Sequence, residues 1–192
     1  MELNPPTPQA ILDSPNVNIH PKFGHMILIK PENDSVKNFY ENKSVELYST
    51  EHEQNSHKDS GLDLYCPESF TIPAGKMLLV DMGVKAAAYQ IKFDVLENKR
   101  VYYPTAYHLY MRSSAPKHGL ILANSVGIID SGYRGNLMAR FYNTTEQDVT
   151  IDASTRLVQI CLPNLQYDFK MDVVGHLEET ARGEEGLGST GV

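Results

Sequence analysis

Short apolar runs separated by turn-forming residues are the main pattern of the chain from Gly61 onward. The runs are rich in Val, Ile, Leu and Tyr, and Gly, Pro and Asn punctuate them, which is typical of β-strands. The alternation is clearest in residues 135–142, where Leu137, Ala139 and Phe141 fall on one face. The pattern predicts strands at residues 76–81, 83–93, 101–111, 135–143, 148–152, 155–162 and 168–176.

The segment before these runs carries a helical pattern. Val36, Phe39 and Tyr40 recur at i, i+3 and i+4, which favours a short helix opened by the Asn33-Asp34 pair. A strand is expected before it at residues 25–30, and a polar loop after it at residues 51–59. Since no long amphipathic helix alternates with the strands, a parallel α/β sheet is disfavoured. The sequence predicts an all-β domain, a jelly-roll-like distorted β-barrel with a short helix.

The two ends of the chain differ from the middle. The first 22 residues hold five prolines and few apolar anchors, which indicates an extended, weakly ordered arm. The last eleven residues hold four glycines and no pattern that would build a core, which indicates a flexible tail. The expected organisation is an arm at 1–22, a β domain at 23–177 and a tail at 178–192.

Composition narrows the class of protein. The 192 residues and 21.5 kDa fit one globular domain with tails. A net charge of −7 argues against a nucleic-acid partner, because such binding relies on Lys and Arg against phosphates. No apolar run is long enough for a membrane helix, and the start lacks the blocks of a signal peptide, so we expect no membrane partner. Two cysteines far apart in sequence favour a reducing compartment, cytoplasmic or nuclear.

Two short segments in the middle of the chain offer candidate chemistry. Arg112, Ser113 and Ser114 supply a guanidinium fork and two hydroxyls, a sensible cradle for an anion, although a surface turn has the same composition. Asp130 follows Ile128 and Ile129, so its carboxylate would be partly desolvated and able to act as a base. An Asp in a hairpin turn that bonds its own backbone is the alternative.

The glycine-rich tail is a third candidate. Glycines let backbone N–H groups converge on an anion, and Arg182, Ser189 and Thr190 add donors. No Lys precedes Ser189, so the tail is not a Walker A motif, and an ordinary frayed terminus is the alternative. His176 and Glu178 match a fragment of the zinc-deaminase motif, but no PCxxC follows, so we interpret the match as chance.

Taken in order, these segments resemble the five motifs of the homotrimeric dUTPase (deoxyuridine triphosphate nucleotidohydrolase) family. The similarity runs from about residue 24 to the end, and the third motif matches closely. The five segments are residues 60–64 (SGLDL), 112–114 (RSS), 124–137, 156–160 (RLVQI) and 182–191. The resemblance implies the family's β-clip fold and hydrolysis of dUTP to dUMP and pyrophosphate. That reaction keeps uracil out of DNA and supplies dUMP.

The resemblance also assigns site residues. It implies that Asp130 activates the water that attacks the α-phosphate, and that Asp63 holds Mg²⁺ through water; a structural turn carboxylate is the alternative for Asp63. The expected substrate-binding residues are Arg112, Ser113, Ser114, Asn124, Gly127, Ile128, Ile129, Tyr133, Met138, Gln159, Arg182, Gly186, Leu187, Gly188, Ser189 and Thr190. In the family the tail of a neighbouring subunit closes over the nucleotide, which implies a homotrimer with shared active sites.

Departures from the family pattern leave alternatives open. Leu187 stands where an aromatic residue usually stacks on uracil, and residues 89–103 resemble an inserted hairpin turning at residues 97–100. The dCTP deaminases also carry an RSS triplet, but Arg140 stands where their catalytic glutamate would be. A non-catalytic interaction protein, using the arm, the 43–59 loop and the insertion, is the other alternative.

Overall fold

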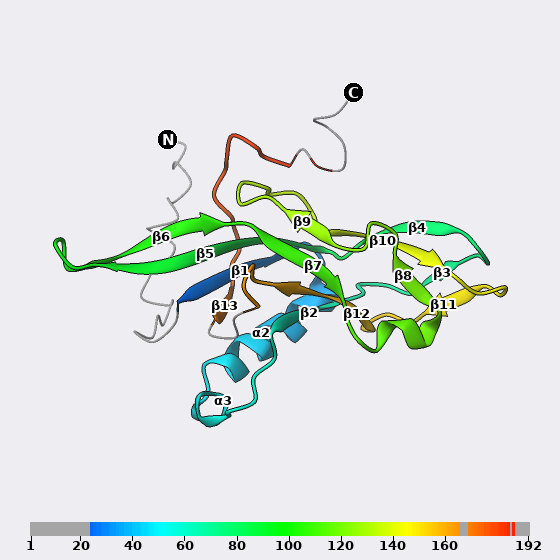
Figure 1. The fold of residues 1–192 in the computed structure, drawn as a ribbon, viewed down its shortest axis with the longest axis horizontal. Helices are drawn as coiled ribbons and strands as arrows, with labels where there is room; N and C mark the ends of the chain where they lie inside the picture. The colour runs from blue at the N-terminus through cyan, green and yellow to red at the C-terminus, as the bar shows by residue number, and fades with distance from the viewer. Residues whose placement is uncertain (1–23, 166–168, 185, 187–192) are drawn as a thin grey trace.

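The structure is a computed structural model that describes residues 24–165, 169–184 and 186 (Figure 1). Strands dominate it, with two helices near the start and one short 3-10 helix. In chain order the elements are β1 (His25–Pro31), α2 (Asp34–Leu47), α3 (Thr50–Gln54), β2 (Gly61–Tyr65), β3 (Phe70–Ile72), β4 (Met77–Asp81), β5 (Val84–Asp94), β6 (Lys99–Thr105), β7 (Tyr107–Met111), η1 (Ala115–His118), β8 (Leu120–Leu122), β9 (Gly127–Ile129), β10 (Met138–Asn143), β11 (Val149–Ile151), β12 (Arg156–Cys161) and β13 (Phe169–Val173).

Four small sheets share these strands. Their strand orders are β13-β1-β5-β6, β4-β10-β8, β11-β3 and β2-β12-β7-β9. Among the described strands, every pairing is antiparallel except that of β1 with β13. The prediction of an all-β, jelly-roll-like domain with a short helix is therefore confirmed.

One hydrophobic core lies between the sheets. Strand β10 shows how the sequence pattern builds it, because Leu137 just before the strand is 0% exposed, and Ala139 and Phe141 within it are 1% and 0% exposed. Residues of β1, β2, β7 and β12 fill the same core. The alternation seen in the sequence is thus confirmed, and it fixes which face of each strand is left for a site.

The helical segment is longer than the sequence predicts. Asn33 caps α2 by accepting a hydrogen bond from the Ser35 N–H at 2.8 Å, and Val36 and Tyr40 lie in the core. Ser49 then caps α3, so the prediction of a polar loop at residues 51–59 is wrong for its first four residues. No helix in the described part of the chain is long and apolar enough to cross a membrane.

The stretch 101–111 is two strands rather than the one predicted. It divides at Ala106, so β6 pairs with β5 while β7 joins β12 and β9 in another sheet. The expected long hairpin is present as β5–β6, which projects from the body (Figure 1). Its turn lies at residues 95–98, two residues earlier than expected, because the Asp94 carboxylate accepts hydrogen bonds from the Leu96 and Glu97 N–H groups.

Both cysteines are buried and unpaired, as expected from their spacing. Burial raises the pKa of the Cys66 and Cys161 thiols to about 11. Each thiol is therefore protonated at neutral pH and packs as a small apolar group.

Candidate active site

A pocket of about 110 Å³ lies beside the turn that connects β9 to β10. Strand β9 packs tightly on β7, and a Cβ on Gly127 would lie 3.0 Å from the Cβ of Leu109. The turn begins with a hydrogen bond from the Tyr133 N–H to the Asp130 carbonyl at 3.0 Å. The pocket is lined by Ile128, Ile129, Asp130, Tyr133, Met138, Arg182 and Gly186. The sequence resemblance assigned Asp130 to catalysis and the other six to substrate binding.

The ring of Tyr133 is held in one place. Its hydroxyl donates a hydrogen bond to the Asn136 carbonyl at 2.8 Å. Added Cβ atoms would lie 2.5 Å from its hydroxyl oxygen at Gly135 and 2.9 Å from its Cε2 at Gly186, so two glycines are needed for the ring to fit. Burial first, then the Asp81 carboxylate, raises the pKa of Tyr133. The tyrosine is therefore a neutral, fixed wall of the pocket.

Asp130 sits at the mouth of the pocket with its carboxylate in solvent. Its side chain is 63% exposed, so the expectation of a partly desolvated carboxylate is wrong for the isolated chain. The Arg182 guanidinium lies 3.6 Å from Asp130 Oδ2. A carboxylate in this position is open to a ligand or to a second chain.

The C-terminal segment packs on the turn of its own chain. The Arg134 N–H donates to the Gly183 carbonyl at 2.8 Å, and the Thr180 hydroxyl donates to the Gly132 carbonyl. The buried Arg134 side chain donates to the Glu178 carbonyl at 3.0 Å. Up to Gly183 the segment therefore lies against the turn of its own chain, and the expectation that the tail closes over the site of a neighbouring subunit stays a prediction.

The remaining predicted tail residues lie outside the described residues. They are Leu187, Gly188, Ser189 and Thr190. Asn124, also assigned to substrate, lies exposed between β8 and β9 and is not among the residues that line the pocket.

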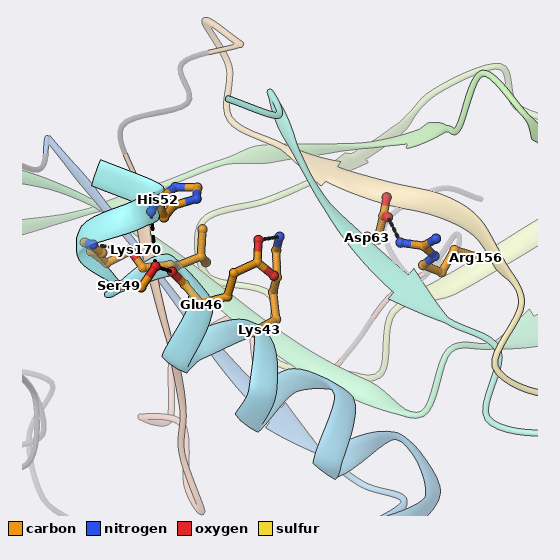
Figure 2. A network of polar contacts seen from close by, with 8 residues as sticks. Lys43, Glu46, Ser49, His52, Asp63, Arg156 and Lys170 are labelled. Carbon is orange, nitrogen blue, oxygen red and sulfur yellow. Dashed lines mark hydrogen bonds and ion pairs between the residues drawn. The ribbon is translucent and has the colours of Figure 1, made fainter. Parts of the chain in front are cut away.

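A second group of residues gathers at the far end of β7. Figure 2 shows two of them, Asp63 and Arg156, and the contact between them. Asp63 on β2 pairs through its Oδ1 with Arg112 Nε at 2.6 Å and through its Oδ2 with Arg156 Nη1 at 3.0 Å. Ser113 and Ser114 follow Arg112 directly and lead into η1. We call Asp63, Arg112 and Arg156 the arginine cluster; its two cations around one anion leave a site suited to a polyanion.

Gln159 completes this end of the sheet. It lies on β12, opposite Asp63 on β2 and Tyr110 on β7. Its amide donates to the Met111 carbonyl at 3.4 Å. Gly61 makes room for it, because a Cβ there would overlap the Gln159 carboxamide.

The charged groups around Asp63 do not fit a resident metal ion. Both of its carboxylate oxygens are engaged by guanidinium groups, and each additional positive charge nearby opposes a cation. Among the described residues there is no group of three His, Cys, Asp or Glu that could hold a metal. The assignment of Asp63 to magnesium through water stays a prediction.

The pocket and the arginine cluster lie at opposite ends of β7. Ile129 of the pocket pairs with Tyr107 at the start of β7, and Arg112 follows its end. Five residues of extended chain span about 16 Å. The pocket and the arginine cluster of one chain are therefore separate regions.

Sequence reasoning missed two residues that build the pocket. Arg134 and Asp81 contact the turn residues directly. Their positions in the sequence form no pattern that would mark either residue as part of the pocket. Arg140, the position that argued against a deaminase, is exposed on β10 and is not among the pocket-lining residues.

Comparison with known proteins gives the class of molecule that this fold and pocket define. The sequence model of dUTPase matches residues 99–191. The deoxyuridine 5'-triphosphate nucleotidohydrolase of Cutibacterium acnes is 34% identical over 139 residues, which cover 70% of this chain and 80% of that protein. This chain belongs to the dUTPase family.

Two further similarities cover shorter stretches. The deoxyuridine 5'-triphosphate nucleotidohydrolase of Gamma-proteobacterium EBAC31A08 is 44% identical over 77 residues, which cover 40% of this chain and about half, 54%, of that protein. The crystal structure of dUTPase from Streptococcus mutans aligns with a TM-score of 0.43 and 33% identity, covering 56% of this chain and 79% of that chain.

Proposed function

We propose that this protein hydrolyses dUTP to dUMP and pyrophosphate. The observation that carries the proposal is the pocket beside Asp130, because the third and fifth motif segments supply six of the seven residues that line it, and the seventh, Met138, directly follows the third. The names of the relatives support the same substrate. The reaction would limit the incorporation of uracil into DNA and supply dUMP.

The pocket accounts for recognition of the nucleoside. Uracil would bind along β9 through the backbone of Gly127 to Ile129, with Met138 beside it. The fixed Tyr133 ring would pack under the sugar and leave no room for a 2′-hydroxyl. A rigid wall discriminates well because it cannot relax around the extra oxygen.

Asp130 would orient and deprotonate the attacking water. An in-line attack on the α-phosphorus forms the new P–O bond as the bond to the pyrophosphate oxygen breaks, and the water proton passes to the Asp130 carboxylate. A positioned base contributes about 10²- to 10⁴-fold. The rest must come from neutralising the phosphates, a task suited to Arg112, Ser113, Ser114 and Gln159. Magnesium would arrive as part of the substrate, on the triphosphate oxygens.

We propose a homotrimer with shared active sites, and the separation of the two regions along β7 supports it. A neighbouring chain would bring its arginine cluster to the pocket, since the cluster of the same chain lies at the other end of β7, about 16 Å away along the strand. In a closed three-fold ring of such contacts, every pocket meets the arginine cluster of a neighbouring chain. Light scattering should therefore give three times the 21.5 kDa of the chain, and an active monomer would contradict the trimer.

Pyrophosphate release from dUTP, dTTP, dCTP and UTP in the presence of Mg²⁺ tests the proposed function. We expect rapid release from dUTP and little from the other three, because the proposed pocket would exclude the 5-methyl group, the cytosine edge and the 2′-hydroxyl. Comparable turnover of dCTP would contradict the proposal. Ammonia release from dCTP would instead favour a deaminase.

A further inference from the structure

A chain of hydrogen bonds joins the pocket tyrosine to a carboxylate outside the five motif segments. We infer that Asp81 is a positioning residue that holds Tyr133 in place and so sets the discrimination between deoxyribose and ribose. The inference rests on the proposed function, since it concerns the same pocket. It adds a residue of β4 to a site otherwise built from the third and fifth motif segments.

The contacts form a continuous path. The Tyr133 hydroxyl donates to the Asn136 carbonyl at 2.8 Å, and the Asn136 side-chain amide donates to Asp81 Oδ2 at 2.7 Å. The other oxygen of Asp81 accepts from the Gly83 N–H at 2.7 Å. Each carboxylate oxygen therefore has a donor, and Asn136 is fixed by its side chain while its carbonyl holds the tyrosine.

The register of the strands puts Asp81 beside the wall of the pocket. It pairs directly with Met138, which lines the pocket. The Met82 N–H donates to the Leu137 carbonyl at 2.9 Å, and the Leu137 N–H donates to the Val84 carbonyl at 2.8 Å. The corner between β4 and β5 thus holds the backbone that follows Asn136 through hydrogen bonds, and Asp81 holds the Asn136 side chain.

The position of the hydroxyl end of Tyr133 depends on these hydrogen bonds to Asn136. Gly135 and Gly186 confine the ring at close range, so its remaining freedom lies at the contact with Asn136. Steric exclusion of a 2′-hydroxyl tolerates little displacement, and a shift of about 1 Å is enough to change a rate substantially. Loss of Asp81 would release Asn136, let the ring move and admit the ribose.

A purely local role for Asp81 is the competing explanation. Its bond to Gly83 is also a turn contact, and Asp94 makes the same kind of contact in the β5–β6 hairpin, to the Leu96 N–H at 2.9 Å. Asp94 lies at the end of β5, away from the residues that line the pocket. It is therefore a matched control for the loss of a turn-capping carboxylate.

The test is the ratio of kcat/KM for dUTP to that for UTP in the full-length protein and in Asp81→Ala, Asp81→Asn and Asp94→Ala. We expect Asp81→Ala to lower the ratio about fivefold, the worth of one net hydrogen bond. Asp81→Asn, which keeps one acceptor and the shape of the side chain, should lower it less, and Asp94→Ala should leave it unchanged. An unchanged ratio in Asp81→Ala, or an equal change in Asp94→Ala, would overturn the inference.

Two further measurements keep the inference separate from folding and from the proposed function. If Asp81→Ala does not fold, the isosteric Asp81→Asn carries the test, and an unchanged ratio there overturns the inference. If the parent protein does not hydrolyse dUTP, the proposed function fails while the contact can still be measured by ultraviolet titration, with Tyr133→Phe to identify the signal. Removing the Asp81 charge should lower the pKa of Tyr133, and an unaltered pKa would overturn the contact.

Discussion

The base pocket and the arginine cluster are built by different means. Backbone groups, two close glycines and a hydrogen-bonded tyrosine define the pocket. Long charged side chains define the cluster, where Arg156 is 45% exposed and both arginines bind a single carboxylate. The pocket is therefore suited to selecting a nucleoside, and the cluster to neutralising whatever phosphates the pocket delivers.

The difference between the pocket and the arginine cluster also bears on how several chains would assemble. The pocket lies within one chain, but the arginine cluster of that chain lies about 16 Å away along β7. Asp130, with 63% of its side chain exposed, and Arg156, with 45%, are both open to a second chain. The comparison supports the proposed shared site, in which each chain would offer its pocket to one site and its arginine cluster to another.

The largest effect is expected from removing the base at the pocket. Asp130→Asn keeps the shape of the side chain but cannot take the proton, so turnover should fall by about 10²-fold or more while dUTP binding is largely retained. Single-turnover kinetics and equilibrium binding separate the two quantities. A variant that turns over within tenfold of the parent would show that Asp130 is not the base.

A smaller effect is expected from the cluster. Arg112→Ala should lower kcat/KM about 10- to 100-fold, because it removes a charged hydrogen-bond donor to phosphate. The loss in kcat/KM should be smaller at high salt, because salt already weakens the attraction between an exposed arginine and phosphate in the parent protein. Arg140→Ala, an exposed arginine on β10, is the matched control and should change little; equal losses in the two variants would remove the cluster from the phosphate site.

The smallest effect on turnover is expected from tying the C-terminal segment to the pocket turn. A Cβ on Gly132 would lie 3.9 Å from the Cβ of Thr180, close to the mean of about 3.8 Å in disulfides. Gly132→Cys with Thr180→Cys should therefore cross-link within one chain, with activity near that of the parent. On a non-reducing denaturing gel the product should run as a single chain, and covalent dimers or trimers would place the segment on a neighbour, as the family resemblance implies.

Much of the fold was predictable from local pattern. The period-two alternation in β10 and the helix start at Asn33 depend on neighbours in sequence, and both predictions were confirmed. The division of 101–111 at Ala106 was not predictable, because both halves read as strand and only their partners differ. Helix α3 was missed because its residues are polar and its signal is the single cap Ser49.

The site likewise has residues that were predictable from the sequence and residues that were not. The motif residues that line the pocket were assigned from sequence, and the structure brings them together. Arg134 and Asp81 were missed because their partners are backbone carbonyls and an amide that are brought close only by folding. The pairing of Asp63 with two arginines was also invisible, since the three residues lie far apart in the chain.

Complementation between two inactive variants tests the shared site most directly. One chain carries Asp130→Asn and the other Arg112→Ala, the two are co-expressed with different tags, and trimers that carry both tags are isolated. In such a ring one site of the three combines an intact pocket with an intact cluster, so dUTP turnover should recover to about a third of that of the parent. Mixed trimers no more active than the two variants alone would show that pocket and cluster act within one chain, and the account would be wrong.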